Sequence, residues 1–218
     1  MDFKRMLDYS AALYLHNERA WFHENHRQYE LARGDFISLL DGLRFKIASA
    51  APDLTADILP MQARDWVYRT AHDMRYRRNG PPYDPAFRAY ISADRKSWRP
   101  IGYFLRIFPG SSCFGTGLWC ESPDTLHRAR LYAAEHSGEL EAAERACGVP
   151  VAGDRLKRVP RGWEEDHPAA HWLKFRNWFV IEDIDDGLLT DFDSFGDHIS
   201  GLTERMEPVR QILLRMSR

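Results

Sequence analysis

The stretch that decides the fold is IGYFLRIFPGSSCFGTGLW, residues 101–119. Its first part, residues 101–108, is a short apolar run rich in aromatic and β-branched residues, which predicts a buried strand. A Pro-Gly pair follows it as a turn signal. The rest is predicted to be a further strand or a glycine-broken loop, in which Gly115 and Gly117 permit a bulge or a close approach of another backbone.

Shorter strand candidates surround this stretch. RDWVYRT (64–70) and FRAYIS (87–92) precede it, and NWFVIEDI (177–184) follows it. The NGPP segment at 79–82 separates the first two and is predicted to be a turn. Strands at this spacing, with turn signals between them, predict an antiparallel sheet.

Helices are predicted in the first fifty residues. Asn17 is a preferred N-cap residue, with Glu18 in the first turn of the helix that would follow. The Gly-Asp pair at 34–35 is predicted to end that helix and to cap the next one. The Ala-Pro pair at 51–52 is predicted to stop the second helix.

Three more helices are predicted later in the chain. A Ser-Pro pair at 122–123 opens the first of them with favoured N-cap and N1 residues, and a break is expected near 137–138. AAHWLKFR (169–176) is predicted to be a short helix. The last helix runs from Ser194, and Pro208 is expected to kink or split it.

The order of these elements indicates the fold class. Helices come first, then meander strands, then mixed elements, and this order favours an α+β domain over a doubly wound sheet. We therefore predict a single domain over residues 1–218. It should have a largely antiparallel central sheet, with N-terminal helices, a middle helix and a C-terminal helix packed around it.

Bulk composition excludes several classes of protein. Hydrophobic residues make up 44% of the chain and charged residues 28%, which argues against wholesale disorder. The three cysteines contain no C-x-x-C pair, so neither a disulfide framework nor a zinc ribbon is indicated. Since the sequence shows no secretory signal and no apolar run near the ~18 residues of a membrane span, a soluble cytoplasmic protein without a membrane partner is expected.

Charge is distributed unevenly, although the formal net charge is only −2. The segment 64–106 holds ten basic and four acidic residues, whereas 182–197 holds seven acidic residues and no basic one. We expect the two segments to neutralise each other within the fold. The overall balance argues against a dedicated nucleic-acid binder.

Several longer motifs follow one another along the chain. They are Asn17 with Trp21-Phe22, Glu24-Asn25 and Tyr29-Glu30, then Arg69, Asp73, Arg75-Tyr76, Pro82-Tyr83 and Phe87, then GYFLRIFPGSS and GTGLW, and finally LKRVPRGWEEDHP and WLKFRNWFV. In these motifs the sequence resembles the bacterial family known as domain of unknown function 2461, over nearly its whole length. The resemblance implies a cytoplasmic bacterial protein of unassigned activity and supplies no catalytic residues.

The sequence departs from the pattern of the resembled family in its most polar motif. His72 stands where Arg is usual, and Arg78-Asn79-Gly80 stands where Lys-Asp-Lys is usual. Asp84 stands where Lys is usual. An anion site implied by the resemblance would therefore be weaker in this chain, or shaped differently.

The same region indicates a site through its own chemistry. Arginine guanidinium groups are planar, bidentate donors suited to phosphate or carboxylate. Arg69, Arg75 and Arg78 lie near the predicted turn together with Tyr83, so they would hold an anionic ligand. The alternative is a basic β-hairpin whose arginines pair with nearby aspartates and with the acidic 182–197 segment.

A second candidate lies in PRGWEEDHPAAHWLKFR, residues 160–176. His167 with an orienting carboxylate would make a general base, but Asp166 is predicted instead to cap a helix that starts at Pro168. His171 would share the face of His167 in a two-ligand metal clip, for which no third ligand is evident. We therefore predict no metal and no cofactor.

The remaining histidines and cysteines give weaker signals. His23 and His26 do not form an H-E-x-x-H motif and are predicted to be surface residues. Cys113 and Cys120 are predicted to be structural thiols in preference to nucleophiles.

Three functions stay open from the sequence, and whether the protein is an enzyme stays undecided. The first is a cleft for a small phosphate- or carboxylate-bearing ligand, with candidate residues Arg69, Asp73, Arg75, Arg78, Tyr83, Trp119 and His167. The second is a hydrolase that uses Asp73 or His167 as its base. The third is an interaction protein that binds nucleic acid or an acidic protein through residues 64–106.

Overall fold

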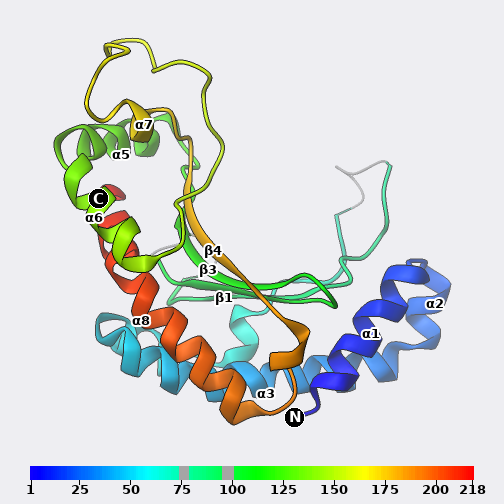
Figure 1. The fold of residues 1–218 in the computed structure, drawn as a ribbon. Coiled ribbons are helices and arrows are strands. Elements are labelled where there is room, and N and C mark those ends of the chain that lie inside the picture. Colours follow the sequence, from blue (N-terminus) through cyan, green and yellow to red (C-terminus); the bar gives the residue numbers. More distant parts are fainter. Residues whose placement is uncertain (74–78, 95–100) are drawn as a thin grey trace.

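A four-stranded antiparallel sheet lies at the centre of the computed structural model, which describes residues 1–73, 79–94 and 101–218 (Figure 1). In these ranges the strands lie side by side in the order β1 (Phe87–Ile91), β2 (Tyr103–Ile107), β3 (Ser112–Leu118) and β4 (Trp178–Ile184). Every neighbouring pair is antiparallel. The predicted α+β class and its antiparallel sheet are confirmed.

The strand predicted at 64–70 is wrong. Ala63–Trp66 forms a short 3-10 helix, η2, and Val67 then makes an isolated bridge with Ala89. The indole of Trp66 is fully buried, and its Nε1 donates to the carbonyl oxygen of Ser92 at 2.9 Å. Burial of that ring turns the segment inward, so it does not extend along the sheet.

Helices cover one face of the sheet and extend beyond one end of it. Figure 1 shows α3 and α8 along the covered face, with α5, α6 and α7 beyond the end where β3 stops and β4 begins. The helices are α1 (Phe3–Leu15), α2 (Arg19–Glu24), α3 (His26–Ala50), η1 (Pro52–Leu54), α4 (Thr55–Ile58), α5 (Pro123–Glu135), α6 (Ser137–Cys147), α7 (Ala170–Leu173), η3 (Asp186–Leu188) and α8 (Phe192–Met216). Among the described residues, none of these helices combines the length and the apolar character that crossing a bilayer requires.

The helix break predicted at 34–35 is wrong, because α3 runs through it. The buried residues Ala32, Phe36 and Leu40 form one continuous apolar stripe across that point. The Asp35 carboxylate accepts a hydrogen bond from the Asp2 backbone at 3.0 Å and pairs with Arg5, so it anchors α1 and does not cap a helix.

The other helix boundaries largely match the sequence. Ser122 accepts from the Thr125 backbone N–H as predicted, and the break near 137–138 separates α5 from α6. The stop at 51–52 is also confirmed. The last helix begins two residues before Ser194, since Asp191 is its N-cap, and it continues unsplit through Pro208.

Side chains alternate between the two faces of the sheet. Ala89, Leu105 and Phe114 point toward the helices and are fully buried. The opposite face carries Phe104 and Ile181, which keep partial exposure. The helices therefore cover the first face, while the second keeps partial exposure at these two side chains.

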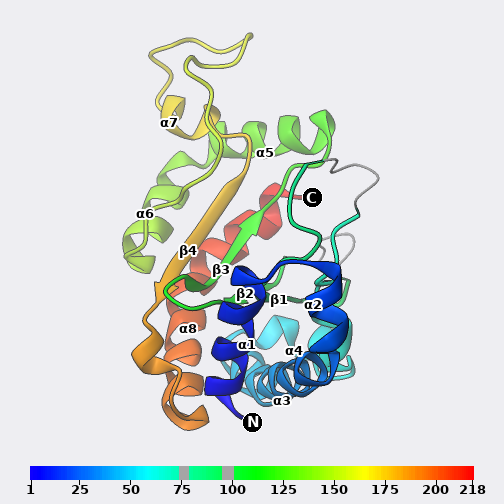
Figure 2. The same ribbon diagram turned by 90° about the vertical axis from the view of Figure 1, so that its right-hand side faces the viewer.

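A fully buried arginine joins the helices to the sheet. Arg210 lies on α8, which packs against α3 and across β3 (Figure 2). Its guanidinium donates to both Glu207 carboxylate oxygens, to the Ile101 carbonyl oxygen and to Asp53 in η1. The Tyr103 hydroxyl on β2 also donates to Glu207, at 2.6 Å. Although burial opposes it, the hydrogen bond from Arg210 keeps the pKa of Asp53 below its ordinary value.

Replacement of Arg210 by methionine should lower the free energy of unfolding by about 3–5 kcal/mol, because it leaves the partly buried Glu207 carboxylate without its cation. Urea denaturation measures this change. The matched control is Arg205→Met on the same helix, which removes an exposed pair with Glu182 and should cost no more than about 1 kcal/mol. Equal effects of the two substitutions would contradict the structural role of Arg210.

Candidate functional site

A hollow of about 270 Å³ lies where α2 and α3 meet the segments that precede β1. We call it the Arg33–Arg69 hollow. Its described lining consists of Phe22, Tyr29, Arg33, Val67, Tyr68, Arg69, Thr70, Ala71 and Tyr83. Two of the residues predicted from the sequence, Arg69 and Tyr83, are therefore brought together there.

Two chain segments that run side by side form one wall of this hollow. Ala71 makes an antiparallel bridge with Tyr83, and the Asp84 N–H donates to the Thr70 carbonyl oxygen at 2.7 Å. The His72 N–H donates to the carbonyl oxygen of Pro82 at 2.9 Å. This pairing fixes the backbone on which Arg69 stands, and the residues 74–78 that connect the two segments lie outside the described residues.

Asn17 connects this wall to the helices. Its side-chain amide donates to the Tyr83 carbonyl oxygen at 2.9 Å and accepts from the Tyr83 N–H at 3.0 Å. The prediction that Asn17 caps a helix is therefore wrong: α2 begins at Arg19, and Glu18 occupies the N-cap position without a side-chain cap hydrogen bond. Both polar groups of the Asn17 amide are instead bonded to Tyr83, which lies 66 residues further along the chain.

Aromatic packing holds the wall against α2 and α3. The Phe22 and Tyr83 rings stack with centroids 4.1 Å apart and planes inclined by 14°. The Tyr29 hydroxyl lies 3.1 Å from the Thr70 hydroxyl, so the two share a hydrogen bond. Tyr83 is 8% exposed, so it is a buried structural wall and not a mobile surface ring.

Two cations line the hollow without a protein counter-ion in the described part of the chain. Arg33 is partly buried on α3, one turn after Tyr29, and Arg69 is exposed. Within the described ranges neither guanidinium makes a hydrogen bond or an ion pair. Sequence reasoning missed Arg33, because the expected helix break at 34–35 placed it at a terminus; its spacing of four from Tyr29 was the available signal.

The other predicted site residues are not gathered at this hollow. Arg75 and Arg78 lie outside the described residues. Asp73 is exposed next to that gap and has an interaction partner. Trp119 is 47% exposed at the end of β3 and lines two different hollows.

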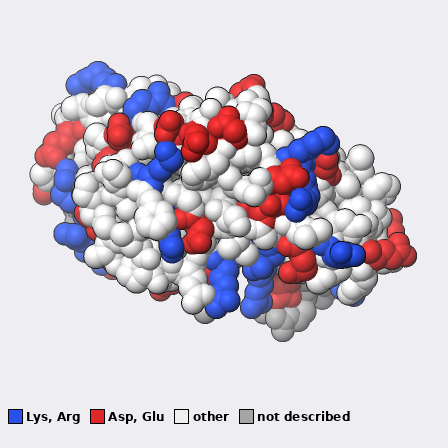
Figure 3. All heavy atoms as spheres, turned by 90° about the horizontal axis from the view of Figure 1, so that it is seen from below, with Lys and Arg blue, Asp and Glu red and all other residues white. Residues whose placement is uncertain are grey.

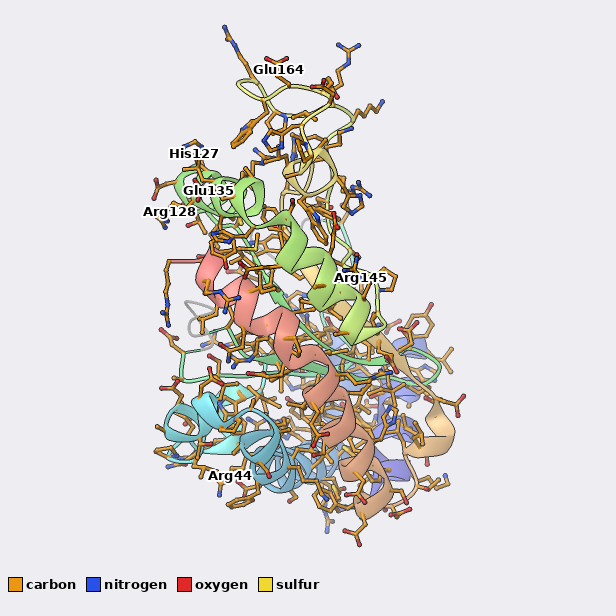
Figure 4. All side chains as sticks on the ribbon, turned by 60° about the vertical axis from the view of Figure 1, so that its left-hand side comes forward. Arg44, His127, Arg128, Glu135, Arg145 and Glu164 are labelled. Atoms are coloured by element: carbon orange, nitrogen blue, oxygen red, sulfur yellow. The ribbon has the colours of Figure 1, made fainter. Side chains whose placement is uncertain are left out.

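His167 lies in the long loop before α7 and has a local role. Its Nδ1 accepts from the Ala169 N–H at 3.0 Å, and its ring meets Trp163 edge-on at 5.2 Å. The prediction that Asp166 caps this helix is wrong. α7 begins at Ala170, and the N–H of the preceding residue, Ala169, donates to the His167 ring. Figure 4 shows Glu164 at the tip of this loop, far from the end of the molecule that carries Arg44.

His167 and His171, the pair weighed above as a metal clip, are each engaged within the protein. His171 Nδ1 lies 3.2 Å from an Arg155 nitrogen, and burial followed by the Arg155 charge lowers the pKa of His171. Arg155 can only donate, so the Nδ1 lone pair is already used. In the described ranges, no group of three or more His, Cys, Asp or Glu is arranged to hold a metal ion.

Cys113 and the N-terminal histidines agree with the sequence predictions, while Cys120 is only partly buried. Cys113 is buried and burial raises the pKa of its thiol, which disfavours the nucleophilic thiolate. His23 and His26 are exposed on α2 and α3.

Two acidic residues of the 182–197 segment pair with basic residues outside the 64–106 segment, and six of the ten basic residues of that segment lie outside the described residues. In the acidic 182–197 segment, Glu182 pairs with Arg205 and Asp197 pairs with Lys46. Figure 3 shows Lys and Arg interleaved with Asp and Glu on the helix-covered side. That face therefore carries no extended field of one sign, such as a nucleic-acid surface requires.

Comparison with known proteins places the chain in a family. A family model described as "Conserved hypothetical protein (DUF2461)" matches residues 5–211 of the 218-residue chain. The chain belongs to this family. No curated protein and no solved structure is significantly similar to it.

One departure from the DUF2461 pattern has a structural explanation. Asp84 stands where a Lys is expected, and its carboxylate pairs with Arg88 at 3.0 Å and accepts from the Ala86 N–H. Asp84 is therefore satisfied next to β1 and does not place a free negative charge in the hollow.

Replacement of Asn17 by alanine should release the Tyr83 backbone, because it removes both hydrogen bonds to that residue. The expected loss in free energy of unfolding is about 1–3 kcal/mol. Hydrogen exchange measured by NMR should show faster exchange at the Tyr83 amide and unchanged exchange in β2.

The control is Asn25→Ala, whose side chain bonds only locally to the Trp21 carbonyl oxygen. Exchange at Tyr83 should be unaffected by it. If Asn17→Ala left the Tyr83 amide as protected as in the wild type, Asn17 would not hold the wall.

Proposed function

We propose that the protein binds a small phosphate-bearing molecule in the Arg33–Arg69 hollow. The observation that carries the proposal is that Arg33 and Arg69 line one hollow whose described lining includes no Asp or Glu. Two guanidinium groups without an acidic partner offer several N–H donors in the geometry that suits a phosphoryl group.

The charge of the described lining favours phosphate over carboxylate. Two positive charges match the charge of a phosphate monoester at neutral pH, which is close to −2. Asp84, which follows Tyr83 of the lining, is already paired with Arg88 at 3.0 Å. A singly charged carboxylate would leave one guanidinium unmatched.

Hydroxyl groups add donor capacity. Tyr29 and Thr70 share one hydrogen bond, and together they carry two hydroxyl protons. One proton is used between them, so the other is available to an oxygen of the ligand. Arg33 and Tyr29 project from the same face of α3, which places this donor beside the cation.

The hollow is largely preorganised. The stacked Phe22 and Tyr83 rings and the Asn17 clamp fix its walls before any ligand binds. A rigid site loses little conformational entropy on binding, so modest contacts suffice for measurable affinity. The proposed class of ligand, phosphate-bearing molecules, is narrower than the phosphate- or carboxylate-bearing ligands expected from the sequence. The hydrolase and interaction hypotheses stay predictions.

Inorganic phosphate should raise the melting temperature of the wild-type protein at constant ionic strength. At ten times its dissociation constant the ligand adds about 1.4 kcal/mol of stability, which corresponds to about 3–6 °C for a chain of this size. Arg33→Gln and Arg69→Gln should each remove more than about half of the shift, and the double variant should abolish it. Differential scanning fluorimetry provides the measurement.

The matched control is Arg64→Gln in η2, which removes one exposed positive charge five residues from Arg69 but lies outside the described lining. It should keep the full phosphate shift. An equal loss in Arg64→Gln would indicate general charge screening, and a full shift in the double variant would refute the proposed site.

A further inference from the structure

The uncovered face of the sheet carries a separate apolar slot of about 210 Å³, which we call the Trp119 slot. Trp119 and Ile181 are large apolar side chains left 47% and 46% exposed at its edge. Trp119 stacks on Phe179, with ring centroids 5.9 Å apart. Its described lining is Tyr90, Phe104, Gly115, Thr116, Gly117, Trp119, Phe179 and Ile181.

Strand register explains the shape of this slot. Phe104, Gly115 and Ile181 are direct cross-strand neighbours, and Gly117 lies opposite Phe179. A Cβ on Gly115 would stand 2.4 Å from the Val180 carbonyl oxygen, and one on Gly117 would stand 2.2 Å from the Phe179 ring. The predicted close approach at both glycines is therefore confirmed. The missing side chains leave a flat floor between aromatic walls, which is suited to a planar ring.

A polar recess of about 460 Å³ adjoins the slot, and Trp119 lines both. We call it the Arg130 recess. It lies between the start of α5 and the residues just before β4, and its described lining is Trp119, Cys120, Glu121, Ser122, Pro123, Leu126, Arg130, Asp154, Leu156, Arg176 and Asn177. An apolar slot and a polar recess that share one aromatic wall form a two-part site.

Two arginines provide the positive charge in this recess. Arg130 donates to the Phe175 carbonyl oxygen at 3.1 Å, while its buried Nε has no partner among the described residues. Burial of the guanidinium lowers the pKa of Arg130. The Arg176 side chain is exposed and makes no hydrogen bond within the described ranges. An anion between these two groups would offset the cost of burying Arg130.

Nearby acids limit the charge of that anion. Asp154 and Glu121 line the same recess as the two arginines. Asp154 accepts a hydrogen bond from Asn177 at 3.3 Å, and Asn177 also accepts from the Cys120 N–H. Two cations and two carboxylates leave little net charge, so a singly charged group is favoured over a phosphate dianion. The described lining of the Arg33–Arg69 hollow, in contrast, has two arginines and no Asp or Glu, so its net charge is positive.

We propose that the Trp119 slot and the Arg130 recess together bind a planar aromatic ring system that bears a single carboxylate. The ring lies on the glycine floor against Trp119 and Phe179. The carboxylate meets the guanidinium groups of Arg130 and Arg176. This site shares no described lining residue with the Arg33–Arg69 hollow, so it does not depend on the proposed phosphate site.

Isothermal titration calorimetry with 2-naphthoate tests the proposal on the full chain. We expect a dissociation constant on the order of 100 µM for the wild type. Naphthalene-2-carboxamide, which keeps the ring and lacks the charge, should bind at least about 10-fold more weakly. 2-Naphthyl phosphate should also bind more weakly than the carboxylate.

Variants locate the two halves of the site. Trp119→Ala and Arg176→Gln change exposed side chains and should leave the fold intact. Circular dichroism spectra of the variants test this. Each should weaken 2-naphthoate binding by at least about 10-fold. The control is Arg128→Gln on α5, whose side chain pairs with Asp124 on the outer side of the helix (Figure 4) and lies outside the described recess lining. It should leave binding unchanged, as should Arg69→Gln.

The following results would overturn the proposal: no binding of 2-naphthoate by the wild type, equal binding of the carboxamide, or tighter binding of the phosphate. Unchanged affinity in Trp119→Ala or Arg176→Gln would also overturn it. A comparable loss in Arg128→Gln would reveal non-specific charge attraction and would count equally against the site.

Discussion

The buried guanidinium of Arg210 ties the helices to the sheet. It joins the C-terminal helix α8 to η1 through Asp53 and to the entry of β2 through the Ile101 carbonyl oxygen. Tyr103 completes the group through Glu207, and burial followed by the Glu207 charge raises the pKa of its hydroxyl well above the ordinary value. Each of the three guanidinium nitrogens of Arg210 donates a hydrogen bond, so this group fixes one relative position of helix and sheet.

That fixed position determines where function can lie. Because α3 and α8 cover one face of the sheet, the opposite face and the edges of the helix layer are what remain for ligands. The Arg33–Arg69 hollow forms at the edge where α3 meets the segment before β1, and the Trp119 slot forms on the open face. The two regions differ in charge balance, and this difference leads us to assign phosphate to one and an aromatic carboxylate to the other.

Local patterns in the sequence predicted the four strands of the sheet and most helix ends. They failed at residues whose position depends on contacts with distant parts of the chain. Partial alternation identified the strand at 87–92, an apolar run identified the strand at 101–108, and Ser122 capped its helix as expected. Asn17 looked like a cap, but its amide binds Tyr83, far away in sequence. The site was predicted only in part: Arg69 and Tyr83 do meet, but Trp119 and His167 lie elsewhere. The spacing of four between Tyr29 and Arg33 was the local signal for Arg33, and the packing of α3 brings it to the same hollow.

The central claim is that Arg33 and Arg69 form one anion site without an internal counter-ion in the described structure. A crystal structure of the protein soaked with tungstate, an electron-dense analogue of phosphate, tests this claim most directly. We expect a bound anion between the two guanidinium groups, within hydrogen-bonding distance of both and near the hydroxyls of Tyr29 and Thr70. An empty hollow whose two arginines are paired with acidic side chains of the same chain would contradict it.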